Sequence, residues 1–519
     1  MNKITLIILL LIVTTFLNAQ GNYKDFEKST ILSTNNLLVS VGNTGFILDW
    51  GNQIYPLSLK GQTDSRRYLN FMEKLTWGGK VDGEIFYDGK SGTVNLYPGY
   101  ISQSGEKVSP YSREAGLFRL AKNISEMYSE DEYVELMKNY PVDAGAPWKD
   151  IDGDGFFNPE IDAPLLTGDE MIWFVGNDFD NLQEKWTRGI EIRSKIYAFN
   201  NNDIMDNVVF KEFTFVNKSD KTIEDFYIGY QCDTDIGDSK DDAMGCAPDL
   251  NLGFVYNYFQ EDEIYGNITP VMGIQAVNVS KNKYGEINKI SSFVNPEPYI
   301  DPHIDLDYNY EYLWTYNTLS GLSKYTGESF TNNEGVATKY LFAGNPYHNT
   351  GWNYNPEDEV LAGDVKLQLN AGPFDIKPGE EVSVTYAFMG IVEKEHKKGI
   401  QIAMNLADVL LKNYTKYSTP REILHKIAED DPGDYSIAQN YPNPFNPSTT
   451  IKYSVPVETK VTAEVFNILG KKVAVLVNER KDPGNYAVLF DGANLSAGIY
   501  FLKIEMANIT KTIKMTLLK

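Results

Sequence analysis

"KLQLNAGPFDIKPGEEVSVTYAFMGIV", Lys366 to Val392, is the stretch that decides the fold. Polar and apolar side chains alternate on both sides of Ile376–Glu381, where Pro378 and Gly379 stand together. Alternation with a period of two is typical of a half-buried antiparallel strand, and a Pro-Gly pair is typical of a turn. The stretch therefore predicts a strand, a turn and a second strand.

The same pattern recurs along most of the chain. Segments such as "MIWFVGND", "NVVFKEFTFVN" and "LNLGFVYNYF" are rich in β-branched and aromatic residues, and Gly, Asn and Asp separate them. Helices are few: "SEDEYVELMKNY" starts with a capping box of Ser129 and Glu132, and residues 398–417 have apolar residues at helical spacing. We predict an all-β protein with a β-rich body of several parts.

The two ends of the chain suggest how it is divided. "MNKITLIILLLIVTTFLNAQ" has Lys3 before a 13-residue apolar run, Ile4 to Phe16, and Ala19 at the expected cleavage point, as a secretory signal peptide does. Residues 415–434 are polar and contain "TKYSTP" and "EDDPGD", which is typical of a linker. We expect a signal peptide at 1–19, an acidic body at 20–414, a linker at 415–434 and a C-terminal domain at 435–519.

The net negative charge of the chain lies on the body. The 519 residues carry a net charge of −24, although residues 431–519 hold ten Lys and Arg against eight Asp and Glu. An acidic body repels nucleic-acid phosphates, so we expect no nucleic-acid partner. It suits a solvated extracellular surface and the binding of divalent cations.

The C-terminal domain has the pattern of a small β-sandwich of immunoglobulin-like kind. In front of it, Pro442, Pro444 and Pro447 fix φ and predict a semi-rigid spacer. Six strand-like runs follow between short turns: Thr449–Val455, Lys460–Asn467, Lys472–Val477, Asn485–Phe490, Gly498–Met506 and Thr510–Leu517.

"NYPNPFNPSTTIKYSVP", "VFNILGKKVAVLV", "FDGANLSAGIYFLKIE" and "KTIKMTLLK" resemble the C-terminal sorting domain of the type IX secretion system of Bacteroidota. Many members have Trp in place of Phe490 and Ser in place of Ala497. The resemblance implies passage through the periplasm and recognition of residues 435–519 by the translocon and its sortase. Release outside the cell or attachment to surface lipopolysaccharide would follow. The body is similar to exported proteins with the same ending, a family without an assigned activity.

"DIDGDGFFNPEID" is the sharpest motif of the body. Calcium takes six to eight oxygen ligands, and alternating acids with a glycine at the sixth position are typical of calcium loops. The usual acid at the twelfth position is absent, because Ile161 stands there. The loop resembles those of dockerins and thrombospondin type 3 repeats, with a structural calcium ion. The expected ligands are Asp150, Asp152, Asp154, Phe156 through its carbonyl, Asn158, Glu160 and Asp162. An Asp- and Gly-rich turn without an ion is the alternative.

A second, weaker cation site is suggested by "CDTDIGDSKDDAMGC". So many carboxylates in one loop repel each other unless a cation shields them. The candidates are Asp233, Asp235, Asp238, Asp241 and Asp242. Cys232 and Cys246 bracket the loop and are candidates for a disulfide in an oxidising compartment, or for two unpaired thiols in separate strands.

No catalytic motif is present: the chain has no G-x-S-x-G, H-E-x-x-H, P-loop or dinucleotide fingerprint, and its four histidines are scattered. The aromatic stretch Asp305–Gly321 predicts a strand with one face in the core; exposed rings that bind a carbohydrate are the alternative. We therefore expect a calcium-stabilised binding or structural protein outside the cell. A secreted hydrolase acting on polysaccharide or protein is the runner-up.

Overall fold

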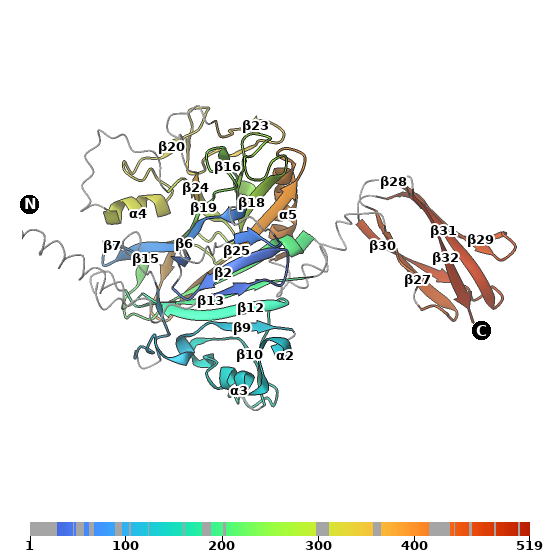
Figure 1. The fold of residues 1–519 in the computed structure, drawn as a ribbon, viewed down its shortest axis with the longest axis horizontal. Coiled ribbons are helices and arrows are strands. Elements are labelled where there is room, and N and C mark those ends of the chain that lie inside the picture. Colours follow the sequence, from blue (N-terminus) through green and yellow to red (C-terminus); the bar gives the residue numbers. More distant parts are fainter. Residues whose placement is uncertain are drawn as a thin grey trace, which may run out of the picture. The chain divides into compact units, whose positions relative to one another are not determined.

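The structure, a computed structural model, forms two compact units, Met1–Thr415 and Lys416–Lys519, which are described separately (Figure 1). The described residues are 29–44, 46–47, 57–61, 67–88, 96–102, 105–122, 124–158, 161–178, 188–200, 204–296, 311–355, 365–414, 436–440, 442–455, 459–481, 484–506 and 509–518. The predicted signal peptide (1–19) and the whole of the predicted linker (415–434) lie outside the described residues.

A nine-stranded antiparallel sheet is the larger sheet of the N-terminal unit. Eight strands follow the order β16-β17-β18-β25-β14-β13-β12-β8, and β9 pairs with β12. Their bounds are β8 Tyr97–Pro98, β9 Phe118–Ala121, β12 Glu170–Asn177, β13 Ile190–Ala198, β14 Val208–Asn217, β16 Asp242–Ala247, β17 Leu252–Asn257, β18 Thr269–Val279 and β25 Glu381–Glu393.

A six-stranded antiparallel sheet packs against it. Its order is β19-β24-β15-β6-β3, and β7 pairs with β6. The bounds are β3 Phe46–Ile47, β6 Met72–Val81, β7 Glu84–Tyr87, β15 Ile223–Asp233, β19 Ile290–Val294 and β24 Lys366–Ile376.

The stretch from Lys366 to Val392 folds into two strands and a turn, as predicted. The turn carries the chain from one sheet to the other, because β24 belongs to the six-stranded sheet and β25 to the nine-stranded one. Apart from Ser383, β25 is buried from Val382 to Ile391, so it is not half-buried as its sequence suggests. The six-stranded sheet covers one of its faces, and the helix α5 (Lys398–Tyr414), predicted from its spacing, packs on β25, β18 and β17.

Aromatic side chains and one buried ion pair fill the space between the sheets. Tyr230 of β15 lies with its ring centroid 5.2 Å from those of Tyr386 and Phe388 of β25. Lys211 of β14 reaches across to pair with Glu73 of β6, and both side chains are almost completely buried. The Lys211 ammonium also lies 4.4 Å from the centroid of the Phe388 ring, a cation–π contact. The sheets are therefore joined by a charged contact in an otherwise apolar layer.

Short elements complete the N-terminal unit. A four-stranded sheet has the order β1-β2-β4-β5, and three further pairs, β10-β11, β20-β21 and β22-β23, are two-stranded. Their bounds are β1 Ser29–Leu32, β2 Leu37–Gly42, β4 Leu57–Leu59, β5 Tyr68–Asn70, β10 Trp148–Lys149, β11 Ala163–Pro164, β20 Phe330–Thr331, β21 Ala337–Thr338, β22 Gly344–Asn345 and β23 Thr350–Gly351. The helical segments are η1 Arg113–Ala115, α2 Ile124–Met127, α3 Glu130–Lys138, η2 Val142–Ala144, η3 Ile204–Asn207, η4 Pro248–Leu250 and α4 Glu311–Leu319.

The strand predicted within Asp305–Gly321 is wrong, because its described part forms α4. Trp314, Tyr316 and Leu319 are the buried residues of this helix. Leu319 fits over Gly78 and Gly229, where an added Cβ would come within about 3 Å of it. Because Gly78 and Gly229 have no side chain, the sheet leaves room there for a helix. The local alternation of aromatic and polar residues does not reveal this packing.

The C-terminal unit is a sandwich of a three-stranded and a four-stranded antiparallel sheet, as predicted. The orders are β26-β27-β30 and β29-β28-β31-β32. The bounds are β26 Ser436–Ile437, β27 Ser448–Val455, β28 Thr459–Asn467, β29 Lys472–Lys481, β30 Gly484–Asp491, β31 Gly498–Met506 and β32 Ile509–Leu517. Its own apolar core includes Ile451, Val461, Leu502 and Met515.

The proline-rich segment is part of this sandwich, so the predicted spacer is wrong. Phe445, between the prolines, is 1% exposed and packs on Phe490, with ring centroids 5.7 Å apart. Its backbone N–H donates to the Thr516 carbonyl at 2.9 Å and its carbonyl accepts the Leu518 N–H at 2.8 Å. The segment therefore adds an apolar side chain and two hydrogen bonds to the end of the sandwich.

Candidate functional site

The acidic stretch Asp150–Asp162 forms the loop of a short hairpin in the N-terminal unit. Strands β10 and β11 pair antiparallel at its base. Strands and not helices flank the loop, so it is not one half of an EF-hand.

Backbone N–H groups of the loop turn toward the loop's own carboxylates. Asp150 accepts hydrogen bonds from the N–H of Gly153 at 2.6 Å and of Gly155 at 3.0 Å. Both glycines have left-handed φ angles, 77° and 79°, which glycine adopts without a steric penalty. The "DGDG" sequence thus lets the chain wind around the first carboxylate.

Asp162 holds the loop from its other end. Its Oδ1 accepts the N–H of Ile151 at 2.9 Å and its Oδ2 accepts the N–H of Asn158 at 2.7 Å. The side chain is buried, whereas those of Asp150 and Asp152 are exposed. Two of the predicted ligands are therefore open to an arriving ion, and the third is fixed beneath them.

The three carboxylates Asp150, Asp152 and Asp162 converge, with one oxygen of each within 4.8 Å of the others. The pKa of Asp152 lies above its ordinary value, because of desolvation and of repulsion by Asp154, Asp162 and Asp150. Hard carboxylate oxygens gathered in this way are the ligands that Ca²⁺ prefers. The group could hold a metal ion, and its chemistry fits calcium.

An aromatic cluster anchors the loop to the nine-stranded sheet. The Phe157 ring lies 5.4 Å from Trp148 and 6.2 Å from Tyr140, measured between centroids. Tyr140 in turn packs on Phe118 at 5.5 Å and on Trp173 at 6.4 Å. Because Phe157 lies inside the loop, a change of loop conformation would alter its packing on Trp148 and Tyr140.

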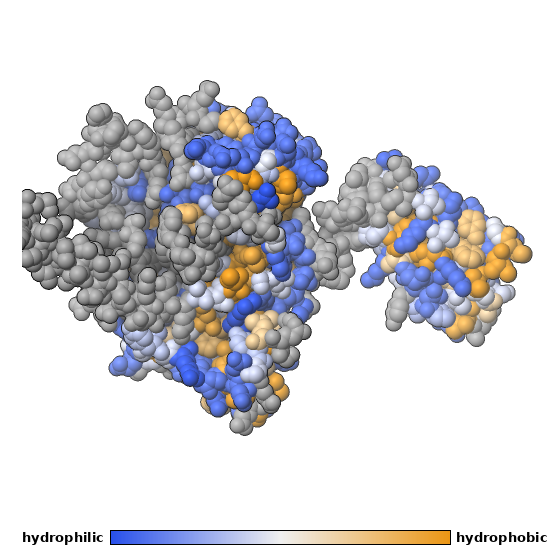
Figure 2. Space-filling model, in the orientation of Figure 1, coloured by the Kyte–Doolittle hydropathy of each residue, from blue (hydrophilic) through white to orange (hydrophobic). Residues whose placement is uncertain are grey.

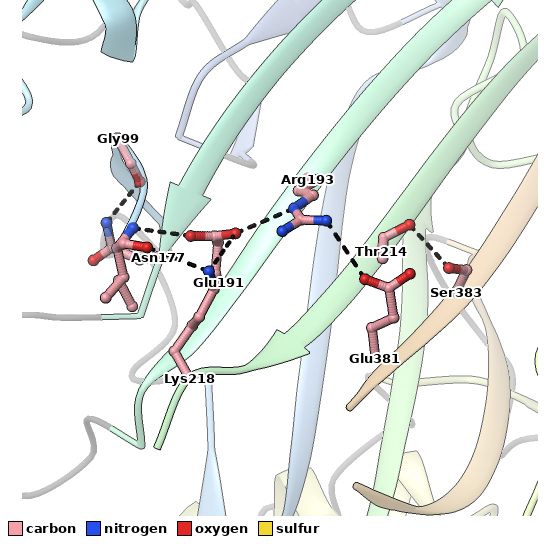
Figure 3. A network of polar contacts seen from close by, with 9 residues as sticks. Gly99, Asn177, Glu191, Arg193, Thr214, Lys218, Glu381 and Ser383 are labelled. Atoms are coloured by element: carbon pink, nitrogen blue, oxygen red, sulfur yellow. Dashed lines mark hydrogen bonds and ion pairs between the residues drawn. The ribbon is translucent and has the colours of Figure 1, made fainter. Parts of the chain in front are cut away.

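The chain that leads into the loop passes beside Arg193. Arg193 belongs to a polar network of the sheet (Figure 3). Gly145 lies against the Arg193 guanidinium, and an added Cβ would come within 2.8 Å of it. Arg193 Nε donates to Glu191 at 3.1 Å, and its Nη1 lies 3.4 Å from Glu381 (Figure 3). Lys218 also lies 3.5 Å from the buried Glu191 carboxylate. The network fixes Arg193, and Arg193 leaves room only for glycine at position 145.

Asp154, another predicted ligand of the loop, is not among the three converging carboxylates. Asp154 Oδ1 accepts the Phe156 N–H at 2.7 Å, and the Phe156 side chain is exposed. Asn158 contributes its backbone, with its carbonyl accepting from the N–H of Asp162 at 2.7 Å. Glu160 lies outside the described residues.

The second acidic cluster is spread over two strand ends and the loop between them. Asp233 ends β15 and pairs with Lys366 at 3.1 Å, so its charge is balanced. Asp242 begins β16, and Asp235, Asp238 and Asp241 lie in the connecting loop. Among the described residues, only Asp150, Asp152 and Asp162 bring three acidic groups within 4.8 Å of one another. The sequence did not point to Asp262, which the fold brings against this loop: it accepts the Asp238 N–H at 2.8 Å.

The disulfide candidate is wrong in this structure, because Cys232 and Cys246 are both free thiols. Cys232 lies in the six-stranded sheet and Cys246 in the nine-stranded one. The Cys246 thiol donates to the Leu341 carbonyl at 3.2 Å. Burial raises the pKa of both thiols, so both are held in the neutral form.

The histidines that the structure describes form no catalytic arrangement. His396 Nε2 lies 3.1 Å from the Asn257 carbonyl, and His348 is exposed beside Tyr347. Within the described part of the chain, no hydrogen bond joins either ring to a nucleophile or a carboxylate. His303 and His425 lie outside the described residues.

A cleft of about 730 Å³ lies beside α3, between β1, β9 and the helix. Two of its carboxylates are already engaged: Glu132 accepts the Ser129 N–H at 2.8 Å in the predicted capping box, and Glu135 pairs with Arg113. Tyr128 closes one side and donates its O–H to the Arg119 carbonyl at 3.1 Å. The lining offers both donors and acceptors, as a polar ligand requires.

The C-terminal unit carries the family match. Residues 439–518 match the family described as "Secretion system C-terminal sorting domain". This confirms the resemblance to the type IX sorting domain and shows that the protein is exported to the cell surface or the extracellular space. The domain interacts with the secretion machinery. Figure 2 shows apolar side chains on the surface of this unit. Leu489, Ile499 and Phe501 are among its exposed apolar residues.

The other comparisons leave the body unassigned. No curated protein matches the chain in sequence. Among solved structures, a polysaccharide lyase is similar at 8% identity and a TM-score of 0.24, with 95% of this chain and 46% of the lyase covered. The adhesin domain of Epf from Streptococcus pyogenes is similar at 8% identity and a TM-score of 0.13, with 66% of this chain and 87% of that one covered. The chain thus spans less than half of the lyase, and such TM-scores assign neither a fold nor an activity.

None of the helices that the structure describes has the length and apolar character needed to cross a membrane.

Proposed function

We propose that the exported body is a calcium-stabilised binding or structural protein of the cell surface or its surroundings. The observation that carries the proposal is the convergence of Asp150, Asp152 and Asp162 within 4.8 Å. Three negative charges at that separation, two exposed and one buried, repel one another, and a Ca²⁺ ion between them would attract all three. The ion would hold Phe157 and its aromatic cluster on the sheet.

The cleft beside α3 supports binding in preference to hydrolysis. A glycosidase needs two carboxylates free to act as acid and base or nucleophile. Here Glu132 caps a helix and Glu135 is paired with Arg113, so both already have structural partners. A neutral carbohydrate is the ligand class that fits a lining of mixed donors and acceptors, and Asn139 and Tyr128 belong to that lining.

The finer steps of export are also part of the proposal. Recognition of residues 435–519 would deliver the body to the translocon, and the sortase would remove the domain. Attachment to surface lipopolysaccharide would then retain the body at the cell, and release would leave it outside.

Calorimetric titration of Ca²⁺ into the purified, chelator-treated full chain tests the proposal. We expect heat of binding that Asp152→Asn diminishes and Asp249→Asn, an exposed acid outside the loop, leaves unchanged. A chain that binds no Ca²⁺ would overturn the proposal, and the hydrolase alternative would then be tested against polysaccharides.

A further inference from the structure

A second group of buried oxygens lies where β16 begins and β17 ends. Asp242 and Asn257 are directly opposite each other in this antiparallel pair. Side chains opposite each other on neighbouring strands lie on the same face, with Cβ atoms about 5 Å apart. Asp242 is 3% and Asn257 1% exposed.

Each of these two side chains has a buried oxygen without a hydrogen-bond donor. Asp242 Oδ2 accepts the Ile236 N–H at 2.9 Å, but no donor within the described residues reaches Oδ1. Asn257 uses its Nδ2 fully, whereas its Oδ1 likewise meets no donor there. Buried polar atoms are nearly always satisfied, so two orphan oxygens at one place indicate a missing partner.

The surroundings of the Asn257 side chain are rich in acceptors and negative charge. Asn257 Nδ2 is surrounded by the Ile236 carbonyl at 3.1 Å, Asp241 Oδ1 at 3.2 Å and Asp262 Oδ2 at 3.1 Å. An amide nitrogen has two hydrogens, so three acceptors exceed what it can satisfy. Among the described residues, no Lys or Arg forms an ion pair with Asp241, Asp242 or Asp262. Arg67 is a cation near this group; it donates to the Ile264 carbonyl at 3.2 Å and forms no ion pair with these acids.

The loop at Gly237 is packed tightly against Asp262. Gly237 has a φ of 78°, and an added Cβ would lie 2.5 Å from both Asp262 oxygens. Asp262 also accepts the Ile264 N–H at 2.7 Å and that of Tyr265. Backbone N–H groups therefore fix the position of the Asp262 carboxylate beside Asn257.

We propose that Asp242 and Asn257 hold a second divalent cation, with Ca²⁺ the expected ion, and that Asp241 and Asp262 complete its surroundings. Calcium accepts a mixed set of carboxylate, amide and carbonyl oxygens, so the site does not need three converging acids. Asp241 is half-exposed and provides the way in. Burial, and after it repulsion from neighbouring acids, raises the pKa of Asp241 to about 6 and the pKa of Asp242 well above its ordinary value. A bound cation would lower both pKa values, because it favours the ionised carboxylates.

The site is separate from the loop at Asp150–Asp162, and its test distinguishes the two. The bound calcium of the chelator-treated and reloaded full chain is counted by elemental analysis, with calorimetry in parallel. We expect two ions in the unchanged chain, one after Asp242→Asn and one after Asp152→Asn. Asp249→Asn is the matched control, because it removes a charge from an exposed position near β16, and we expect two ions.

Two other outcomes would each overturn one of the two calcium sites. One ion that Asp152→Asn abolishes and Asp242→Asn leaves in place would overturn the second site and keep the first. One ion that Asp242→Asn abolishes and Asp152→Asn leaves in place would support the second site and overturn the proposed function of the loop. Should Asp242→Asn not fold, Asn257→Leu removes the other orphan oxygen and keeps the same number of side-chain heavy atoms, branched at the same carbon, and the loss of one ion is again expected. In chelator, Asp242→Asn should melt above the unchanged chain, since it removes a buried charge; a lower melting temperature there would contradict the account.

Discussion

Asp162 accepts the backbone N–H of Ile151 at 2.9 Å and thereby ties the end of the acidic loop to its beginning. The same carboxylate is one of the three that converge. Asp162 therefore has a structural role without an ion and a ligand role with one, whereas exposed Asp152 has chiefly the second.

Asp162→Ala should destabilise the protein both with and without calcium. In chelator the loss of two hydrogen bonds to a buried carboxylate should cost about 1–3 kcal/mol. Asp152→Asn should cost much less in chelator and show its effect only in calcium. Urea unfolding of both variants in each condition measures this. Equal behaviour of the two variants in chelator would show that Asp162 does not hold the loop.

Lys211→Met should be strongly destabilising, because it leaves Glu73 buried without its partner. Breaking a buried ion pair costs about 3–5 kcal/mol, whereas an exposed pair contributes at most about 1 kcal/mol. Lys221→Met, which removes the partner of exposed Asp82, is the matched control. The free energy of unfolding from urea titration is the readout. A loss for Lys211→Met no larger than that of the control would contradict the buried pair.

Both cysteines should titrate as thiols in the exported protein. In denaturant without reductant, a thiol reagent should find two groups per chain, and in native buffer almost none, because Cys232 and Cys246 are buried. A reductant should leave the melting temperature unchanged. A chain without reactive thiols in denaturant would show that the disulfide forms after all.

Phe445→Ala should loosen the C-terminal sandwich and leave the body intact. Removing a buried Phe typically costs about 3–5 kcal/mol. Hydrogen exchange of the full chain, followed by mass spectrometry, should show faster exchange in β27 to β32 and no change in β12 to β14. Leu469→Ala, at a position 85% exposed, is the control. Unchanged protection of β28 and β31 in Phe445→Ala would restore the spacer interpretation.

The sequence predicted what depends on local pattern. Strand periodicity located the six long strands of the C-terminal sandwich, and the Ser129 capping box started α3 where expected. The alternating acids and glycines of the loop identified three carboxylates that do converge. In each case the signal is contained in a few consecutive residues.

What the sequence missed depends on neighbours distant in the chain. Asp305–Gly321 alternates like a strand, but Gly78 and Gly229 create the space that makes α4 a helix. The prolines around Phe445 suggested a spacer, whereas in the fold Phe445 packs on Phe490. Asp262 and Asn257 carry no motif: strand pairing brings Asn257 to Asp242, and hydrogen bonds from Asp238 and Asn257 hold Asp262 beside them. Spacing in sequence could not supply these relationships.

The most direct test of the central claim is the melting temperature of the full chain in calcium and in chelator, for the unchanged protein and for Asp152→Asn. A ligand at a hundred times its dissociation constant stabilises the folded state by about 2.7 kcal/mol. We predict a melting temperature several degrees higher in calcium for the unchanged protein, and a clearly smaller rise for Asp152→Asn. Identical melting of the unchanged protein in calcium and in chelator would contradict the account of a calcium-stabilised body.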